Sequence, residues 1–175
     1  MSVNVSGRQA AQANLADLVT SATGATGLPT GRLTLEVSEA TLIEAGHSMR
    51  HDLNALTRKG VHLALDDFGT GYASLIYLKR FPLDEVKIDR SLVSRVADDV
   101  EGRAVVAAVV SLCRGLGITA TAEGVEAPQQ LAALRDMGCH RAQGYLIGRP
   151  QAPDALQRRL LAGGSHSGHR SAGSD

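Results

Sequence analysis

The chain has 175 residues, and its 18 Lys and Arg residues balance its 18 Asp and Glu residues, so the formal net charge is zero. This balance argues against a general electrostatic nucleic-acid binder, which carries a basic excess. The longest purely apolar run, Ala104 to Val110, is much shorter than the roughly 18 residues that a membrane span needs. Cys113 and Cys139 are the only cysteines, and residues 1–12 have neither the basic start nor the apolar run of a signal peptide. We therefore expect a cytoplasmic domain with reduced thiols, no membrane span and no polymeric nucleic acid as partner.

Short apolar runs alternate along the chain with segments of helical periodicity. In the first third of the chain, the patterns predict a strand at 2–5, a helix at 10–21, a loop at 24–31, a strand at 33–37 and a helix with Met49, Leu53 and Leu56 that stops at Gly60. They then predict a strand at 61–65, a helix at 74–79, a strand at 85–88 and a helix at 104–116. The last predicted elements are a strand at 118–122, a helix from Pro128 to Gly138, a strand at 141–143 and a helix at 153–161. The longest of these helices is expected to bury Val105, Val109, Leu112 and Leu116.

Six strand–helix units in succession indicate an α/β fold with a parallel sheet and helices packed outside it. Either an open doubly wound sheet or a (β/α)8 barrel fits this order. A barrel takes about 250 residues for eight units, or roughly 31 per unit. Residues 163–175 are rich in Gly, Ser and His and are expected to form a disordered tail, which leaves one domain over 1–162. If the fold is a TIM-type barrel, the chain holds about six of the eight units.

A polar side chain lies at or beside the C-terminal end of every predicted strand. These side chains are Asn4, Glu36, Asp66 with Asp67, Lys87, Glu123 and Gln143. In a parallel α/β fold the strand ends share one rim, and that rim carries the active site. Four of these groups are carboxylates and only Lys87 offsets them, so about three negative charges need a counter-ion. Oxygen ligands favour Mg²⁺ or Mn²⁺ over Zn²⁺, so we expect one or two such ions.

The adjacent pair Asp66 and Asp67 suggests two ions rather than one, because one carboxylate can bridge two metals while its neighbour binds only one. Such a pair suits in-line attack on phosphorus, and Lys87 would orient the water or balance the developing charge. Each residue also has a plainer interpretation: Asp residues cap turns and helices, Glu36 and Glu39 are typical of helix starts, and Lys87 could belong to a solvated charge cluster. The recurrence of polar groups at one rim favours the metal site.

Five motifs in order resemble the EAL family of bacterial cyclic di-GMP phosphodiesterases. They are Glu36-Val37-Ser38-Glu39, the run from Leu63 to Ser74, Val86-Lys87-Ile88-Asp89-Arg90, Ala122-Glu123-Gly124-Val125-Glu126 and Gln143-Gly144-Tyr145. Val3-Asn4-Val5-Ser6 is similar to the family's earlier strand, which bears an asparagine. The resemblance covers 2–153, and it implies a (β/α)8 barrel that hydrolyses one phosphodiester bond of cyclic di-GMP to give linear pGpG.

The resemblance also assigns roles to residues. It implies that Asn4, Glu36 and Asp66 hold one divalent cation, Mg²⁺ or Mn²⁺, and that Asp66, Asp67 and Glu123 hold a second. Lys87 would position the attacking water, so Lys87, Glu123 and Asp66 would carry the catalysis. Five further residues are similar to supporting or substrate-contacting positions of the family: Glu39, Asp89, Glu126, Gln143 and Pro150.

One part of the family pattern does not occur in this chain. The strand with the name-giving Glu-Ala-Leu motif lies upstream of the asparagine strand in the family, and no such segment is found here. The missing glutamate is expected to weaken metal binding, and two missing units would leave open edges at 2–5 and 141–143 with an uncovered apolar inner face. A separate N-terminal segment or a second copy in a homodimer could close the barrel. The alternatives to an enzyme are a binding module for cyclic di-GMP or for a protein partner, and an inactive fragment.

Overall fold

The computed structural model describes residues 1–10, 14–44, 47–70 and 75–163. The elements are β1 (Ser2–Val5), α1 (Gly7–Ala10), α2 (Leu15–Thr26), the 3₁₀ turn η1 (Thr30–Arg32), β2 (Thr34–Ser38), α3 (Glu39–Glu44), α4 (His47–Arg58), β3 (His62–Phe68), α5 (Leu75–Arg80), β4 (Glu85–Ile88), α6 (Arg90–Val93), α7 (Val100–Leu116), β5 (Thr119–Ala122), α8 (Pro128–Asp136), β6 (Arg141–Ala142) and α9 (Pro153–Gly163). The predicted tail lies outside the described residues except for Gly163, which ends α9.

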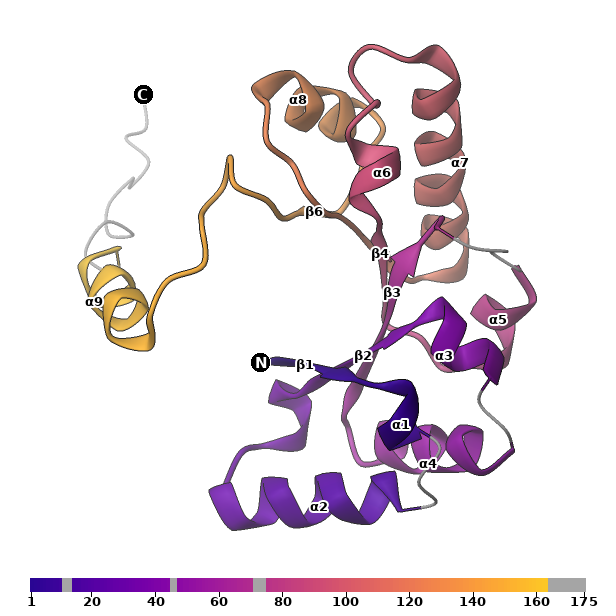
Figure 1. Ribbon diagram of the computed structural model, residues 1–175, viewed down its shortest axis with the longest axis vertical. Coiled ribbons are helices and arrows are strands. Elements are labelled where there is room, and N and C mark those ends of the chain that lie inside the picture. The colour runs from indigo at the N-terminus through magenta and orange to yellow at the C-terminus, as the bar shows by residue number, and fades with distance from the viewer. Residues whose placement is uncertain (11–13, 45–46, 71–74, 164–175) are drawn as a thin grey trace, which may run out of the picture.

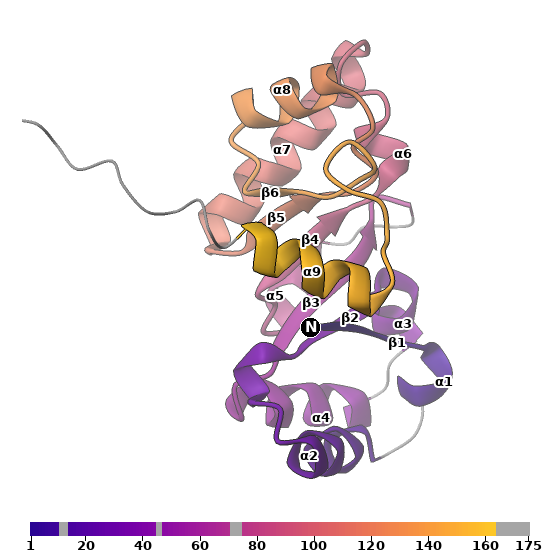
Figure 2. The ribbon, with the colours of Figure 1, turned by 90° about the vertical axis from the view of Figure 1, so that its left-hand side faces the viewer.

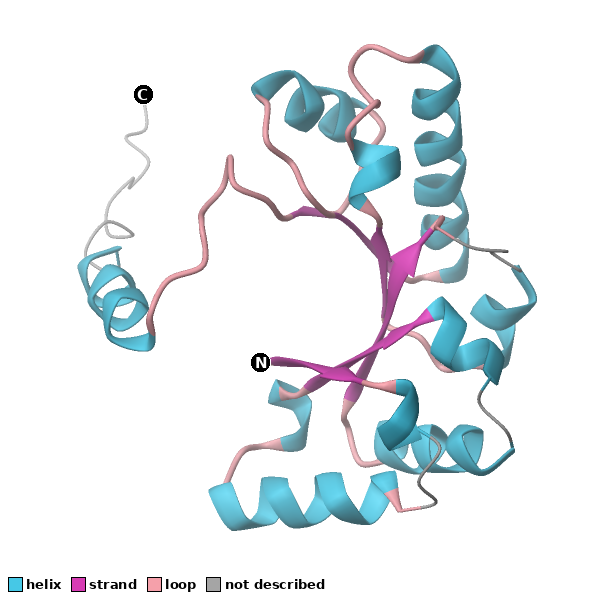
Figure 3. Cartoon of the chain, in the orientation of Figure 1, coloured by secondary structure: helices cyan, strands magenta, loops and turns pink. Residues whose placement is uncertain are grey.

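All strand pairs of the sheet are parallel, and the strands lie side by side in the order β1-β2-β3-β4-β5-β6. A doubly wound sheet would reverse its strand order at a switch point, so this unbroken order selects the barrel arrangement. Helices α1 to α8 lie around one side of the curved sheet, while α9 lies apart on the other side (Figures 1 and 3). The prediction of an incomplete (β/α)8 barrel with six units is confirmed.

The two faces of the sheet differ in polarity, because successive residues of a strand point to opposite faces. The face toward the helices carries apolar side chains that are at most 3% exposed, namely Leu35, Val37, Leu63, Leu65, Val86 and Ile88. The alternating positions place polar side chains on the concave face: Asn4, Thr34, Glu36, His62, Asp66, Glu85, Lys87, Thr121 and Arg141. The expectation of an apolar inner face is therefore wrong, and the concave side of the open sheet can be hydrated at little cost.

The core lies between the convex face of the sheet and the helices. In α7, the prediction of which residues are buried is wrong in part. Val106, Val110 and Cys113 are fully buried, whereas Val105 is 47% exposed and Leu116 is 39% exposed. Of the predicted stripe, Val109 and Leu112 are partly buried and pack against the core, so the prediction is wrong only at its two ends, Val105 and Leu116. The cause is the apolar run at 104–110, which is hydrophobic all round the helix and gives no periodicity from which to choose a face. Within the described residues, no helix has the length and hydropathy to cross a membrane.

Helix α2 also differs from its prediction, since it begins five residues later and continues through Gly24 to Thr26. The helix ends at Gly27, whose φ of 67° closes it in the left-handed conformation that glycine adopts freely. The expected loop at 24–31 is therefore wrong in its first three residues. Short helices α1, α3 and α6 follow the ends of strands and have too few residues for a periodic signal.

The backbone after β6 passes very close to the loop after β5, and Gly144 permits this approach. A Cβ atom on residue 144 would lie 2.2 Å from the Val125 carbonyl oxygen and 2.3 Å from the Val125 nitrogen. We expect Gly144→Ala to destabilise the fold by about 2 kcal/mol and to lower the melting temperature by about 4–8 °C, because backbone atoms must move apart. Gly115→Ala in α7, where the new Cβ meets nothing within 4 Å, is the control and should raise stability by about 1 kcal/mol. Equal melting curves for the two variants, measured by circular dichroism, would contradict this account.

Candidate metal and catalytic site

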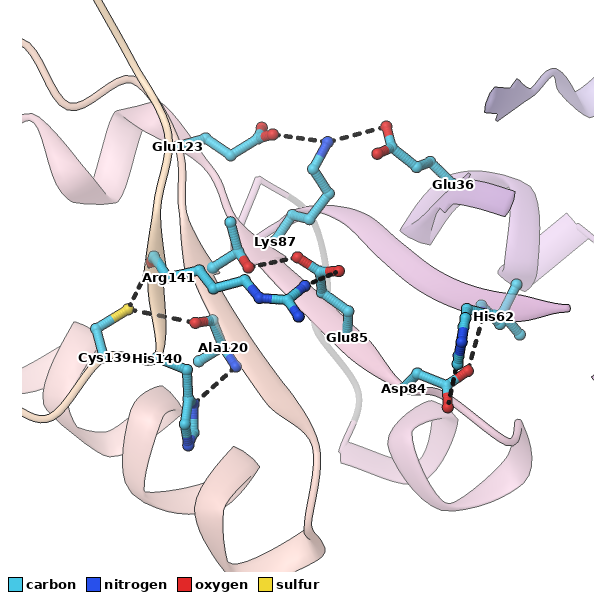
Figure 4. Close-up of polar contacts among 12 residues, drawn as sticks. Glu36, His62, Asp84, Glu85, Lys87, Ala120, Glu123, Cys139, His140 and Arg141 are labelled. Carbon is cyan, nitrogen blue, oxygen red and sulfur yellow. Dashed lines mark hydrogen bonds and ion pairs between the residues drawn. The ribbon is translucent and has the colours of Figure 1, made fainter. Parts of the chain in front are cut away.

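Three carboxylates from different strands converge on the ammonium group of Lys87. The Lys87 Nζ atom lies 2.9 Å from Glu36 Oε2, 2.7 Å from Glu123 Oε1 and 3.2 Å from Asp66 Oδ1. Figure 4 shows Lys87 between Glu36 and Glu123. The four side chains are mostly buried, with 9–20% of each exposed. Charges at this depth interact more strongly than surface charges, so the cluster dominates the electrostatics of the concave face.

The sheet brings these groups together because parallel strands all end at the same rim. Glu36 lies on β2, Asp66 near the end of β3, Lys87 on β4 and Glu123 directly after β5. Glu36, Asp66 and Lys87 occupy the alternate strand positions whose side chains point to the concave face. The two-residue spacing that buries apolar side chains on the convex face therefore also directs these polar groups to the concave face. The predicted convergence at the rim is therefore seen for these four residues.

The Asp66 and Asp67 pair lies at an irregularity in the sheet. The register between β3 and β4 shifts between Leu65 and Phe68, and Asp67 has a φ of 56°. Asp is one of the few non-glycine residues that tolerate this left-handed conformation. Bulges of this kind occur near active sites, where they redirect a side chain. Here the irregularity breaks the strict alternation, which would otherwise send two adjacent side chains to opposite faces of the sheet.

Charge crowding shifts the pKa values of the cluster. Burial lowers the pKa of Lys87, but hydrogen bonds to Glu123 and Glu36 and the charges of Glu123 and Asp66 raise it more, so its net pKa lies above the ordinary value. Burial raises the pKa of Glu123, and the contacts with Lys87 only partly oppose this. Burial and then the charges of Asp66 and Asp89 raise the pKa of Asp67. The raised pKa keeps Lys87 protonated at neutral pH, so one positive charge faces three carboxyl groups.

The donor set fits a hard divalent cation. Asp66 Oδ1 is buried and has no hydrogen-bond partner within the described part of the chain, although Lys87 lies near it. Among the same residues, no three His, Cys, Asp or Glu side chains lie close enough together to hold an ion as they stand. Glu36, Asp66 and Glu123 nevertheless offer only oxygen donors around one point, as Mg²⁺ and Mn²⁺ prefer. Holding an ion there requires the Lys87 ammonium to move from its present position among them.

Two other predicted metal ligands flank the cluster. Asn4 lies on β1 as the register partner of Glu36, and it is exposed at the edge of the sheet. Asp67 follows Asp66 and is also exposed. Both residues lie at the predicted rim. Neither contacts Lys87 in the way that Glu36, Asp66 and Glu123 do.

The remaining predicted residues surround the rim in different ways. Glu39 is the first residue of α3 and is only 4% exposed, whereas Gln143 and Pro150 are exposed in the segment that begins at the end of β6. The backbone of Gln143 is fixed, since its N–H donates to the Ala122 carbonyl and its own carbonyl accepts from the Val125 N–H. The predicted loop residues 71–74 lie outside the described residues.

Asp89 and Glu126 stabilise the two loops beside Lys87 and Glu123. The Asp89 carboxylate accepts a hydrogen bond of 2.8 Å from the Ser91 N–H and thereby caps α6. Glu126 Oε1 lies 3.2 Å from Arg90 Nη2, which joins the loop after β5 to the start of α6. The supporting role that the resemblance implies for Asp89 and Glu126 stays a prediction.

Sequence reasoning missed a second polar network, one layer below the rim. Thr121 Oγ1 donates a short hydrogen bond to the Glu85 carboxylate, and Arg141 Nη1 lies 3.3 Å from the same carboxylate (Figure 4). Thr121, Glu85 and Arg141 stand two positions before Glu123, Lys87 and Gln143, respectively. Residues spaced by two share a face of a strand, so this spacing was the signal that could have revealed them.

The comparisons with known proteins agree with this architecture. A family model described as the EAL domain matches residues 1–150. The chain is 42% identical over 156 residues to the bifunctional diguanylate cyclase/cyclic di-GMP phosphodiesterase MucR of Pseudomonas aeruginosa, covering 89% of this chain and 23% of MucR. It thus spans about a quarter or less of the curated relatives it matches.

Solved structures give the same result. The MucR phosphodiesterase in complex with cyclic di-GMP superposes with a TM-score of 0.83 at 42% identity, over 89% of this chain and 63% of that one. The EAL domain of Mycobacterium smegmatis DcpA has a TM-score of 0.86 at 36% identity, over 93% and 73%. The manganese and cyclic di-GMP complex of Klebsiella pneumoniae BlrP1 has a TM-score of 0.79 at 35% identity, over 85% and 38%. The chain belongs to the EAL domain family.

Proposed function

We propose that this chain carries the catalytic rim of a cyclic di-GMP phosphodiesterase, which uses two divalent cations, Mg²⁺ or Mn²⁺, to hydrolyse cyclic di-GMP to linear pGpG. The observation that carries the proposal is the convergence of Glu36, Asp66 and Glu123 on one buried point at the strand ends. The match to the EAL domain and the cyclic di-GMP complexes of MucR and BlrP1 support the choice of substrate and metal.

The family resemblance supports a division of work among the residues of the rim. Asn4, Glu36 and Asp66 would hold one cation, and Asp66, Asp67 and Glu123 would hold the other. When bound, such a pair supplies positive charge to the phosphoryl oxygens and a more acidic water. The reaction adds water across one P–O bond of the cyclic dinucleotide, which leaves a linear product with one terminal phosphate.

Lys87 is the positive group that the chain itself supplies. Its raised pKa keeps it protonated at neutral pH, so it acts as a hydrogen-bond donor and not as a base. Beside the bound cations it would orient the attacking water and balance negative charge that develops on the phosphoryl oxygens. Glu39, Asp89 and Glu126 would hold the surrounding loops, and Gln143 and Pro150 would face the substrate.

One observation favours a second candidate, a cyclic di-GMP receptor that does not cleave. Asn4 is exposed on β1, and within the described residues no strand lies beyond it to complete the rim. An incomplete ligand set weakens metal binding, and turnover would suffer more than recognition of the dinucleotide.

The test is hydrolysis of cyclic di-GMP by the purified chain with Mn²⁺, followed by chromatography of pGpG, together with binding of the dinucleotide measured by calorimetry. We expect product that depends on Mn²⁺ and disappears with a chelator. Binding without product would favour the receptor. If neither binding nor product occurs at millimolar Mn²⁺, the proposed function is wrong.

A further inference from the structure

We propose that Arg141 is a positioning residue for Lys87. By pairing with Glu85, it keeps that carboxylate from drawing the Lys87 ammonium away from the rim when divalent cations bind there. The inference rests on the proposed function, because it concerns where Lys87 goes once cations occupy the carboxylates around it. Three features of the concave face lead to it: the contacts of Glu85, the register of β4 to β6 and the crowding of charge around Lys87.

Both oxygens of the Glu85 carboxylate are engaged by neighbouring strands. Thr121 on β5 donates a short hydrogen bond to Oε1, and Arg141 Nη1 on β6 lies 3.3 Å from Oε2. The Glu85 side chain is only 17% exposed. In the described part of the chain, Arg141 is the one cationic side chain that pairs with it. Removing Arg141 would leave a mostly buried carboxylate without a counter-ion, which is costly.

The register of the sheet brings the Glu85 carboxylate close to the stem of Lys87. Thr121 is the register partner of Lys87 on one side and of Arg141 on the other, and β4, β5 and β6 lie side by side (Figure 2). Glu85 therefore reaches forward along β4 to two groups that stand level with Lys87. Glu85 and Lys87 share the concave face at a spacing of about 7 Å along the strand, which the flexible four-carbon stem of a lysine can span.

In the structure, the Lys87 ammonium points away from Glu85. It lies 2.7–3.2 Å from the rim carboxylates Glu36, Asp66 and Glu123, and Figure 4 shows it directed to Glu36 and Glu123. Divalent cations bound to the rim carboxylates would displace the ammonium and repel it. An unpaired carboxylate two residues back on the same strand would then attract it. Lys87 held there could no longer orient a water molecule beside the cations.

Arg141 removes this competition because its charge is already paired with Glu85. The Arg141 side chain is 63% exposed, so its guanidinium keeps much of its hydration while it makes the pair. Among the residues that the structure describes, it forms an ion pair with Glu85 and with none of the rim carboxylates. Its influence on the rim therefore passes through Glu85 to Lys87, and Thr121 supports it by occupying the other carboxylate oxygen.

The experiment compares the full chain with Arg141→Leu, with the double variant Arg141→Leu/Glu85→Gln and with Arg103→Leu as the matched control. Arg103 also pairs with a carboxylate, over 3.6 Å to Asp136, but it lies on α7, behind the sheet on its convex side (Figures 1 and 2). Electron paramagnetic resonance of Mn²⁺ gives the metal affinity, and formation of pGpG gives kcat and KM. Circular dichroism shows whether each variant folds, and Arg141→Gln replaces Arg141→Leu if the latter does not.

Arg141→Leu should bind Mn²⁺ about fivefold more tightly than wild type, because the displaced ammonium gains Glu85 as a partner. Its kcat should fall at least about tenfold while its KM changes less than about twofold, because Lys87 acts in the transition state. The added Glu85→Gln removes the competing charge, so the double variant should return to within about twofold of wild type in both measurements. Arg103→Leu should change neither.

The same substitution made in Lys87→Met shows whether Arg141 acts through Lys87. Without an ammonium to capture, Arg141→Leu should change the Mn²⁺ affinity of Lys87→Met less than about twofold. A direct effect of the arginine charge on the cations would persist in this background. A merely loosened rim would instead weaken Mn²⁺ binding, and Glu85→Gln would not restore it.

The proposal is overturned if Arg141→Leu binds Mn²⁺ no more tightly than wild type, or if Glu85→Gln does not reverse the change. It is also overturned if the effect of Arg141→Leu persists undiminished in Lys87→Met. If wild type binds Mn²⁺ but forms no pGpG, the proposed hydrolysis fails, whereas the Mn²⁺ affinities still decide the role of Arg141. A wild-type chain that binds no Mn²⁺ contradicts both proposals.

Discussion

Replacing Asp66 by Asn is expected to lower the rate of cyclic di-GMP hydrolysis at least about a thousandfold. Asp66 is the carboxylate that the proposed site shares between two cations, and its Oδ1 atom is buried with no hydrogen-bond partner in the described part of the chain. Asn keeps the shape but removes the negative charge and leaves a single carbonyl oxygen, so it would bind the two cations much more weakly than the carboxylate. A thousandfold loss corresponds to about 4 kcal/mol of transition-state stabilisation.

The measurement is pGpG formation over time, with Mn²⁺ varied from micromolar to millimolar. Asp98→Asn is the control, because Asp98 is an exposed carboxylate in the loop before α7. It should leave the rate unchanged. A rate for Asp66→Asn within tenfold of wild type at saturating Mn²⁺ would show that this carboxylate is not shared between two ions. Metal binding followed by the electron paramagnetic resonance of Mn²⁺ should weaken in parallel with the rate.

Replacing Lys87 by Met is expected to destabilise the metal-free chain by about 3 kcal/mol, because removing one partner of a buried ion pair leaves the other charges uncompensated. Here three carboxylates lose their counter-ion, with Nζ–O distances of 2.7–3.2 Å in the wild-type protein. For a protein of this size the melting temperature should fall by about 6–12 °C. Lys79→Met, at an exposed position of α5, is the control and should have little effect.

The effect of this substitution should depend on pH in a definite direction. In wild type the raised pKa of Lys87 contributes stability at all pH values below the ordinary lysine pKa, and that contribution is lost only in strong alkali. In Lys87→Met the carboxylates have no ammonium beside them, and burial already raises the pKa of Glu123. The folded variant therefore holds protons that the unfolded chain has lost, so its stability should rise as the pH falls from 7 toward 5.

Binding of a divalent cation should restore part of the stability that Lys87→Met loses. A divalent cation can replace the missing positive charge, so Mn²⁺ should raise the melting temperature of Lys87→Met more than that of wild type, while hydrolysis stays impaired because the orienting ammonium is absent. Denaturation curves at pH 5 and pH 7, with and without Mn²⁺, measure both effects. A pH-independent difference between variant and wild type would contradict the charge argument.

The order of strands and the identity of the rim residues could be predicted because both depend on local patterns. Apolar residues at every second position specify β2 to β5, and Gly60 and Gly138 stop helices in left-handed conformations, with φ values of 89° and 73°. The polar residues Glu36, Asp66 and Lys87 stand beside those apolar residues near the strand ends, and parallel strands bring such ends together. Element boundaries were less certain, since a helix end depends on side chains that compete for its last turn.

The sequence by itself thus determined the α/β fold class and the polar residues of the rim, because these follow from periodicity and from the residue types at strand ends. Only the tertiary structure decided which face of α7 is buried, that Lys87 lies at the centre of the carboxylates, and that Glu85, Thr121 and Arg141 form a second layer beneath them. These features depend on which side chains meet across strands that are distant in sequence. The polarity of the concave face belongs to the same group, because it becomes visible only when the alternations of neighbouring strands are placed in register.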